Sequence, residues 1–451
     1  MRKLPVASLL ILLMIGVGAL VPSGSSSPLG TGETSLTIYS ENLALVNELR
    51  LVELEAGIQE LVLRGLPRQL LPETFRLEAA APGLVRVLEQ EFLPGRELSR
   101  RALLERFIGQ EIIVRDRSGS YAGKLLAVGK EIILQDRTGQ VQIIEEPTGF
   151  TLPYLPEVER ESRLKLLLSS SIAGEQPLRL AYLTRGLNWE ASYTALVDEL
   201  GGKMSLEGMF TVSNSSGKDY EGVQLRLVAG QPHRVGRGPL PYMPMAKAAE
   251  AAPEFVEAPM AEYHLYTLQR PATLRDDQTK RLGFLSAPSV HIEKRYVYER
   301  QVSDGVWLEI SFLNSKLNGL GQPLPAGVVR FYQRGADGEE IFLGEDRLGH
   351  TPVDEQIRLV VGRAFDLVGE WERTEYVKLA RDRYRESFQI TLRNHKQQEV
   401  TIEVIEHLRG DWTITAASHP YEKLDAWRIK FTVAVPAGGA VTISYTVEHV
   451  E

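Results

Sequence analysis

The stretch RIKFTVAVPAGGAVTISYTV (residues 428–447) decides the fold at the carboxyl end of the chain. Large apolar residues such as Phe431 and Tyr445 occupy every second position on either side of its Pro-Ala-Gly-Gly turn. A period of two is typical of strands that bury one face. Further alternating runs begin near Tyr384 and recur about every 8–12 residues, which is the spacing of a sandwich. The sequence therefore predicts an immunoglobulin-like β-sandwich over residues 384–451.

The same alternation extends toward the amino terminus. It predicts a mostly β fold of several antiparallel domains with few short helices. Leu164, Leu166 and Leu168 alternate at the start of a central β-sandwich domain, predicted over residues 158–383. Prolines are frequent from about residue 236 to 260, and no apolar period survives there. This composition predicts an exposed, mobile insertion at about 236–260.

An N-terminal β domain is predicted over residues 31–157, with a barrel-like repeat at 111–147. EIIVRDRSG begins at Glu111 and EIILQDRTG begins at Glu131, and each strand pattern ends in a turn sequence. With the segments between and after them, they predict about five short strands in a closed or half-closed SH3-like barrel. Such a barrel either binds peptides or serves as a packing module, and the sequence leaves both readings open.

One short helix is predicted just before this repeat. Ser99 is the expected N-cap, Leu104 and Phe107 belong to the apolar stripe, and Gly109 ends the helix. Arg101 and Glu105 lie four residues apart, so we expect a weak ion pair on its solvent face.

The first 30 residues predict a signal peptide followed by a flexible tether. Arg2 and Lys3 precede an uncharged apolar run from Leu9 to Val21, which is shorter than the roughly 20 residues of a membrane-spanning helix. A Pro/Ser/Gly-rich segment follows. We therefore expect an exported protein, periplasmic or extracellular. The alternative is an uncleaved segment that anchors the protein, and we expect membrane contact through that segment alone.

Composition narrows the class of partner. The 451 residues include no cysteine, which excludes disulfides, thiolate metal sites and thiol nucleophiles. The net charge is −8, so no basic field offsets the repulsion of phosphates, and we expect no nucleic-acid partner. An exported chain without disulfides needs cores large enough to hold unaided, which 43% hydrophobic residues allow.

No common catalytic, nucleotide-binding or metal-binding motif occurs in the sequence. We therefore predict neither an enzyme nor a cofactor or metal. One polar cluster is a candidate site: Glu345, Asp346, His350 and Asp354, within the segment Glu345–Glu355. In a functional interpretation the histidine is a general base or ligand that a carboxylate orients. In a structural interpretation the segment is a polar loop held by its own hydrogen bonds.

Three blocks in this order resemble the family called domain of unknown function 4139: YLTRGLNWEASYTALVD (182–198), TVSNSSGKDYEGVQLRLVAGQPHRV (211–235) and FLGEDRLGHTP (342–352). The resemblance implies an exported bacterial protein with β-rich domains, and some members are labelled mucoidy-inhibitor-like. Many members carry a coiled coil between their two halves, where this chain has the small repeat. The resemblance brings no established catalytic residues, so the conserved-looking blocks have either a structural or a functional role.

Three hypotheses for function follow. The first is an exported, non-catalytic envelope or extracellular protein that binds another protein or a surface polymer through sheet edges and loops. The second is an envelope-polymer hydrolase with a His/carboxylate site near Glu345–Glu355. The third is a structural spacer between other modules.

Overall fold

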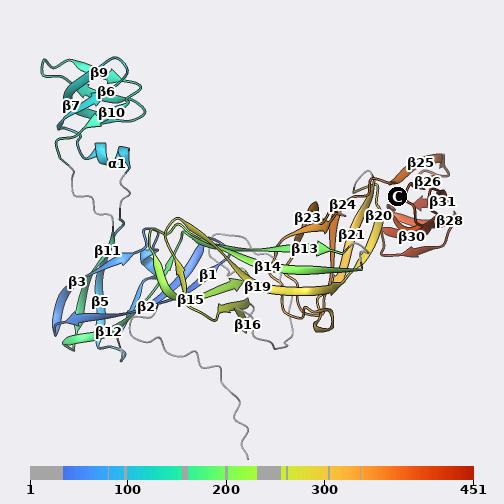
Figure 1. Cartoon of the computed structure of the whole chain (residues 1–451), viewed down its shortest axis with the longest axis horizontal. Coiled ribbons are helices and arrows are strands. Elements are labelled where there is room, and N and C mark those ends of the chain that lie inside the picture. The colour runs from blue at the N-terminus through green and yellow to red at the C-terminus, as the bar shows by residue number, and fades with distance from the viewer. Residues whose placement is uncertain are drawn as a thin grey trace, which may run out of the picture.

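The computed structural model describes residues 34–79, 81–95, 99–154, 161–198, 202–230, 255–260, 263–302, 305–335 and 337–450. The predicted signal peptide and tether at 1–30 lie outside these residues, as does most of the predicted insertion. Strands dominate the described part, which confirms the mostly β prediction (Figure 1). Its helices are few and short: α1 (Arg100–Glu105), η1 (Pro72–Thr74) and η2 (Lys316–Asn318). None of these described helices has the length and apolar character needed to cross a membrane.

An eight-stranded sheet joins strands from the N-terminal and central regions. β1 runs parallel to β15 and antiparallel to β2, so residues near position 36 lie beside residues near position 225. The predicted division at residues 157 and 158 thus falls between strands of one sheet. Its strands are β16 (Phe255–Met260), β17 (Tyr263–Leu268), β15 (Tyr220–Ala229), β1 (Thr34–Tyr39), β2 (Leu43–Leu54), β12 (Gly174–Thr184) and β4 (Arg76–Glu78), with β18 (Ala272–Leu274) beside β15.

Residues 255–260 form a strand, although the sequence placed them in the insertion. β16 pairs with β17 along its whole length, and Phe255 is buried with its ring 5.0 Å from that of Phe210. The loop prediction is therefore wrong for these residues. The reason is that a partner strand further along the chain, rather than a local period, stabilises them.

Two further sheets complete the central core. Phe210 stacks on Phe284 with ring centroids 4.0 Å apart, and the buried Trp189 meets Phe210 edge-on. The five-stranded sheet contains β19 (Gln278–His291), β14 (Lys203–Asn214), β13 (Leu187–Val197), β22 (Gly327–Arg334) and β23 (Glu340–Leu348). The three-stranded sheet contains β3 (Gly57–Leu66), β11 (Ser162–Ser170) and β5 (Val85–Leu93).

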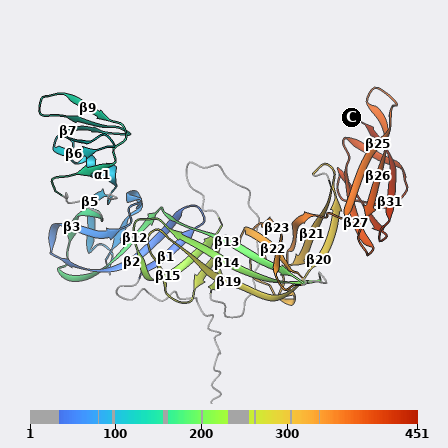
Figure 2. The ribbon, with the colours of Figure 1, turned by 45° about the horizontal axis from the view of Figure 1, so that its top comes forward.

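A six-stranded sheet is shared between two cores (Figures 1 and 2). Ile310 and Leu359 belong to the central core, whereas Ile402 and Phe431 belong to the C-terminal core. The two halves of this sheet meet where β20 runs parallel to β27, a seam of three residue pairs. Its strands are β24 (Gln356–Arg363), β21 (Val306–Leu313), β20 (Glu293–Tyr298), β27 (Val400–His407), β30 (Arg428–Val435) and β29 (Tyr421–Lys423).

A four-stranded sheet packs over the C-terminal half of the six-stranded one. Together they enclose the core predicted from alternation in the last part of the chain. Strands that precede residue 384 also supply this core, through Tyr298 of β20 and Leu367 of β25. An immunoglobulin-like connectivity stays a prediction. The sheet contains β25 (Leu367–Lys378), β26 (Arg383–Asn394), β31 (Ala440–Val450) and β28 (Asp411–Ala417).

The predicted repeat forms a small sheet of its own, at one end of the molecule in Figure 2. In both halves of the repeat an aspartate closes the turn, because Oδ1 of Asp116 and of Asp136 accepts a bond from the N–H two residues on. The described strands leave the sheet open between β9 and β10, so a closed barrel does not form. The strands are β10 (Gly149–Thr151), β6 (Glu111–Arg115), β7 (Ser120–Val128), β8 (Ile132–Gln135) and β9 (Val141–Ile144).

The predicted helix is confirmed as α1, but it ends at Glu105 rather than at Gly109. Oγ of Ser99 accepts a hydrogen bond from the N–H of Ala102 at 3.1 Å, as an N-cap does. Arg101 and Glu105 are 2.8 Å apart. Leu104 of the helix and Phe107 of the turn after it are buried against the small sheet, so this segment closes one side of that core.

Candidate functional site

The two predicted carboxylates on β23 have structural partners. Glu345 lies 3.0 Å from the guanidinium of Arg330 on the neighbouring strand. Asp346 accepts bonds from two backbone N–H groups, that of Arg347 at 2.8 Å and that of Val360 at 2.7 Å. The second bond joins β23 to β24, which belongs to the six-stranded sheet. Asp346 therefore links two sheets.

The other two predicted residues, His350 and Asp354, also form hydrogen bonds with backbone groups. Nδ1 of His350 accepts a bond from the N–H of Ala326 at 3.2 Å. Asp354 adopts a left-handed backbone conformation with φ of 63°, and its N–H donates to the carbonyl of Asn314. Among the described residues, no hydrogen bond or ion pair joins any two of Glu345, Asp346, His350 and Asp354.

His350 instead has a histidine neighbour that the sequence did not reveal. His264 on β17 is 2.6 Å from Glu257 on β16. Burial, and to a lesser extent the charge of His264, hold the pKa of His350 below its usual value. The β16–β17 pairing brings Glu257 to His264, whereas His350 follows β23 more than 80 residues further along the chain, so no sequence spacing could show this arrangement. The described His, Asp and Glu side chains form no group of three able to hold a metal ion.

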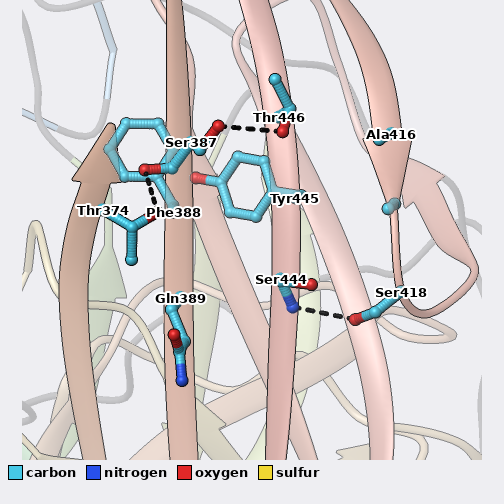
Figure 3. Close-up of a pocket in the computed structure, with 10 residues that line it drawn as sticks. Thr374, Ser387, Phe388, Gln389, Ala416, Ser418, Ser444, Tyr445 and Thr446 are labelled. Carbon is cyan, nitrogen blue, oxygen red and sulfur yellow. Dashed lines mark hydrogen bonds between the residues drawn. The ribbon is translucent and has the colours of Figure 1, made fainter. Parts of the chain in front are cut away.

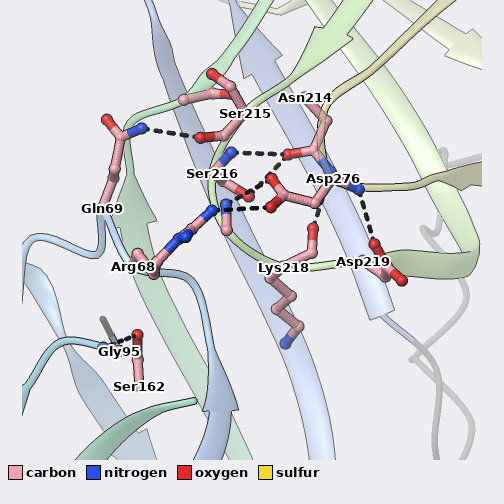
Figure 4. A network of polar contacts seen from close by, with 12 residues as sticks. Arg68, Gln69, Gly95, Ser162, Asn214, Ser215, Ser216, Lys218, Asp219 and Asp276 are labelled. Carbon is pink, nitrogen blue, oxygen red and sulfur yellow. Dashed lines mark hydrogen bonds and ion pairs between the residues drawn. The ribbon is translucent and has the colours of Figure 1, made fainter. Parts of the chain in front are cut away.

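The turn within the second sequence block is a buried polar network (Figure 4). Nδ2 of Asn214 donates to the carbonyls of Lys218 and Leu274, at 2.8 and 3.1 Å. Its Oδ1 accepts bonds from the N–H and the hydroxyl of Ser216. Asn214 is buried with its side chain fully engaged, so this block stabilises the turn between β14 and β15.

Loops from elsewhere in the chain are fastened to the same turn (Figure 4). Asp276 accepts a bond from the N–H of Gly217 at 2.8 Å and forms an ion pair with Arg68 at 3.0 Å. Gln69 donates to the carbonyl of Ser215 at 2.9 Å. The turn therefore joins three chain segments that are distant in sequence.

Lys218 points from this turn into a buried ionic group. Its Nζ lies 2.9 Å from Oε2 of Glu48, whose Oε1 accepts bonds from Arg50 and from the hydroxyl of Tyr182. Burial lowers the pKa of Lys218, and Glu48 opposes that shift. Both charges are thereby compensated within the fold, which is what a buried ion pair requires.

The outer face of the four-stranded sheet carries an open hollow of about 330 Å³ (Figure 3). We call it the C-terminal groove. Every residue that lines it is uncharged, and most carry a hydroxyl or an amide. They are Thr374, Ser387, Phe388, Gln389, Ala416, Ala417, Ser418, Ser444, Tyr445 and Thr446.

Strand register builds this groove. Ser387 lies opposite Thr446 and Gln389 lies opposite Ser444, so the polar side chains of β26 and β31 share the outer face. Phe388 alternates with them and faces the core. The outer strands β25 and β28 each contain a bulge at this level, which locally breaks the regular ladder beside the two inner strands.

The hydroxyls of the groove are held in place. Those of Ser387 and Thr446 lie 3.0 Å apart, and Figure 3 shows them facing each other across neighbouring strands. Oγ of Ser418 accepts a bond from the N–H of Ser444 at 2.8 Å, and the hydroxyl of Thr374 donates to the carbonyl of Ser387. The hydroxyls of Thr374 and Ser387 donate within the protein, the second to Glu375, so they offer a ligand only their lone pairs. The hydroxyl of Ser444 and the amide of Gln389 can supply donors.

Charged residues flank the groove in closed pairs. Arg393 contacts Glu370 with two bonds, at 2.8 and 2.6 Å, and these bonds hold the pKa of Glu370 below its usual value. Arg385 and Arg383 both contact Glu448, whose pKa they lower in the same way. The charged residues on both sides of the groove are therefore already paired with opposite charges.

A signal for the groove was present in the sequence. Positions 387, 389, 391, 442, 444 and 446 are Ser, Gln, Thr, Thr, Ser and Thr, whereas charged residues are common on the exposed faces of strands. Alternation assigns them to the solvent face, but it does not align the two runs. Their alignment depends on a pairing between residues 59 positions apart.

The fold and this site define an all-β protein of several stacked sheets with an open polar face at its C-terminal end. The model of the family described as "Domain of unknown function (DUF4139)" matches residues 178–449, and the chain belongs to this family. The matched region includes both the Asn214 turn and the C-terminal groove. A comparison with curated proteins found no match.

Proposed function

We propose that this chain is an exported, non-catalytic envelope or extracellular protein that binds a surface polymer in the C-terminal groove. One observation carries the proposal: an open face of fixed hydroxyl and amide groups lies across two strands that are rigidly paired on both sides. Such a face can bind an extended chain by hydrogen bonds without moving.

The engagement of the candidate polar cluster supports a non-catalytic role. A general base must reach its substrate's proton with a free nitrogen or oxygen. Asp346 and Nδ1 of His350 instead accept bonds from backbone N–H groups. They fix β23 and the loop at Ala326 relative to their neighbours.

Export is supported by the amino-terminal sequence, and it has its own test. We expect the protein recovered from the cell surface or the periplasm to begin after Ala19 or near Gly24. Fractionation followed by amino-terminal sequencing measures this. Recovery of the intact chain from the cytoplasm alone would contradict export.

Binding is tested by filling the groove. Ser444→Tyr places a ring among the hydroxyls, and Thr432→Tyr places the same ring on the exposed face of β30 in the opposite sheet. We expect the unmodified protein and Thr432→Tyr to co-sediment with insoluble surface polymer of the producing cell, and Ser444→Tyr to stay in solution. Equal sedimentation of both variants would place binding elsewhere.

A further inference from the structure

We propose that the polymer is a neutral polysaccharide, which crosses β26 and β31 in the groove and continues over an exposed aromatic ridge beyond β28. This inference rests on the proposed function and names its ligand. Three features of the described residues support it: charge, backbone pairing and exposed rings.

The charges around the groove argue against an acidic polysaccharide as the ligand. The lining residues are uncharged, and the neighbouring Arg373, Arg385 and Arg393 are already paired with glutamates. Glu372 lies next to Gln389 on the exposed face, and Glu375 accepts a bond from Ser387. An anionic polymer would meet these carboxylates and no unpaired cation in the groove, which is unfavourable.

Backbone pairing excludes an extended peptide bound as an additional strand at this site. Peptides bound in that way take hydrogen bonds from a free strand edge. β26 pairs with β25 and β31, and β31 pairs with β26 and β28, so both inner strands have used their edges. Over these two strands only side-chain hydroxyls and amides remain, and these can bond to the hydroxyl groups of a sugar chain.

A group of exposed apolar side chains follows the groove along the chain. β28 leaves the groove through Ser418 and leads directly into β29, where Tyr421 is 40% exposed. Leu424 and Trp427, on the turn that follows, are 37% and 57% exposed. We name this group the aromatic ridge: the rings of Tyr421 and Trp427 together with the aliphatic side chain of Leu424. Large rigid rings with an apolar face offer contact area to sugar rings at little cost in conformational entropy.

The ridge is fixed as firmly as the groove. Asp425 accepts bonds from the N–H of Trp427 at 2.8 Å and from Arg428 at 2.8 Å, which sets the turn. Lys423 lies over the ring of Trp412, 4.6 Å from its centroid, and the indole of Trp412 donates to the carbonyl of Ala426. The turn that carries Trp427 is therefore already ordered before a ligand binds.

The test uses surface polysaccharide from the producing cell, separated by anion exchange into a neutral and an acidic fraction. The whole protein is run through gels that contain one fraction, and its retardation gives the affinity. We expect retardation by the neutral fraction. Gln389→Ala and Trp427→Ala should each weaken it roughly five- to tenfold, the effect of one hydrogen bond or one ring contact. Ser444→Tyr should abolish it, and Thr432→Tyr should leave it unchanged.

The outcomes separate the inference from the proposed function. Retardation by the acidic fraction alone, still abolished by Ser444→Tyr, overturns the neutral ligand and leaves the groove as the binding site. Binding of an envelope protein at the groove, with no retardation by either fraction, also overturns it. If Gln389→Ala and Ser444→Tyr change no interaction while circular dichroism shows them folded, both proposals fail.

Discussion

The hydroxyl of Tyr445 donates a 2.6 Å hydrogen bond to Oε2 of Glu406 inside the C-terminal core. The indole of Trp371 donates to the same oxygen at 3.1 Å. Burial raises the pKa of Glu406, although these two bonds oppose the shift. A carboxyl group thus lies in the core beneath the groove, where burial favours its neutral form more than water does.

We predict that Glu406→Gln changes how stability depends on pH. Because the pKa of Glu406 is raised above 4.5 in the folded state, the folded protein holds a proton there that the unfolded chain has lost. Wild-type stability therefore falls as pH rises from 4.5 through the folded pKa. The glutamine variant lacks this term, so its free energy of unfolding should improve relative to wild type over that range, as measured by urea titration at several pH values.

Glu370→Gln is the matched control. The pKa of Glu370 is lowered by Arg393, so its contribution is present above 4.5 and is lost as pH falls through the folded pKa. As pH rises toward 4.5, the free energy of unfolding of Glu370→Gln should therefore fall relative to that of wild type. If both variants shift the same way, burial does not govern Glu406.

We predict that Asn214→Ala destabilises the protein by about 2–4 kcal/mol, because it leaves buried backbone groups without partners. Asn394 closes an equivalent turn after β26, with bonds from Nδ2 to the carbonyls of Gln398 and Val435. Asn394→Ala should cost about as much. The measurement is chemical denaturation, with the exposed Gln389→Ala as a control expected within about 0.5 kcal/mol of wild type. A small effect at Asn214 would show that water replaces its bonds.

We predict that Gly344→Ala is strongly destabilising, by about 3 kcal/mol or more. A methyl group at Gly344 would overlap the carbonyl oxygen of Val361 on β24, and backbone cannot yield as a flexible side chain does. Gly349→Ala is the control, since a methyl there meets no atom within 4 Å. Thermal unfolding compares the two. Equal melting temperatures would mean that β23 and β24 can separate without cost.

We predict that His264→Gln raises the pKa of His350. The charge on His264 disfavours protonation of His350, so its removal should shift the titration of His350 upward. NMR titration of the imidazole protons measures this, with His291→Gln as a control elsewhere on the surface. An unchanged titration would show that burial alone lowers the pKa of His350.

The sequence was sufficient for features that depend on neighbouring residues. Ser99 caps the helix and Leu104 is buried on it, both as expected, although Phe107 lies beyond the end of the helix. The Asp-Arg-Ser/Thr-Gly turns after Asp116 and Asp136 close by bonds between residues two apart. Alternation likewise separates core from surface in β30 and β31. In each case the decisive contact is local.

The candidate site could not be predicted in this way. Proximity in sequence grouped Glu345 with His350, but residues that alternate along a strand and its following loop point to different neighbours. The groove needs Ser387 beside Thr446, and the histidine pair needs β17 beside the loop at Ala326. Long-range register decides both, and a single sequence contains no direct record of it.

The three-pair contact between β20 and β27 has a mechanical consequence. Tyr296, Val297 and Tyr298 pair with Ile402, Glu403 and Val404, and Arg295 adds an ion pair to Glu403. By contrast, β27 and β30 are joined by eight pairs. A pull exerted on the last two sheets, while the rest of the molecule is held, therefore acts on the shortest of these ladders. The molecule will part there first, and Tyr298 of β20 will leave the C-terminal core as it does so.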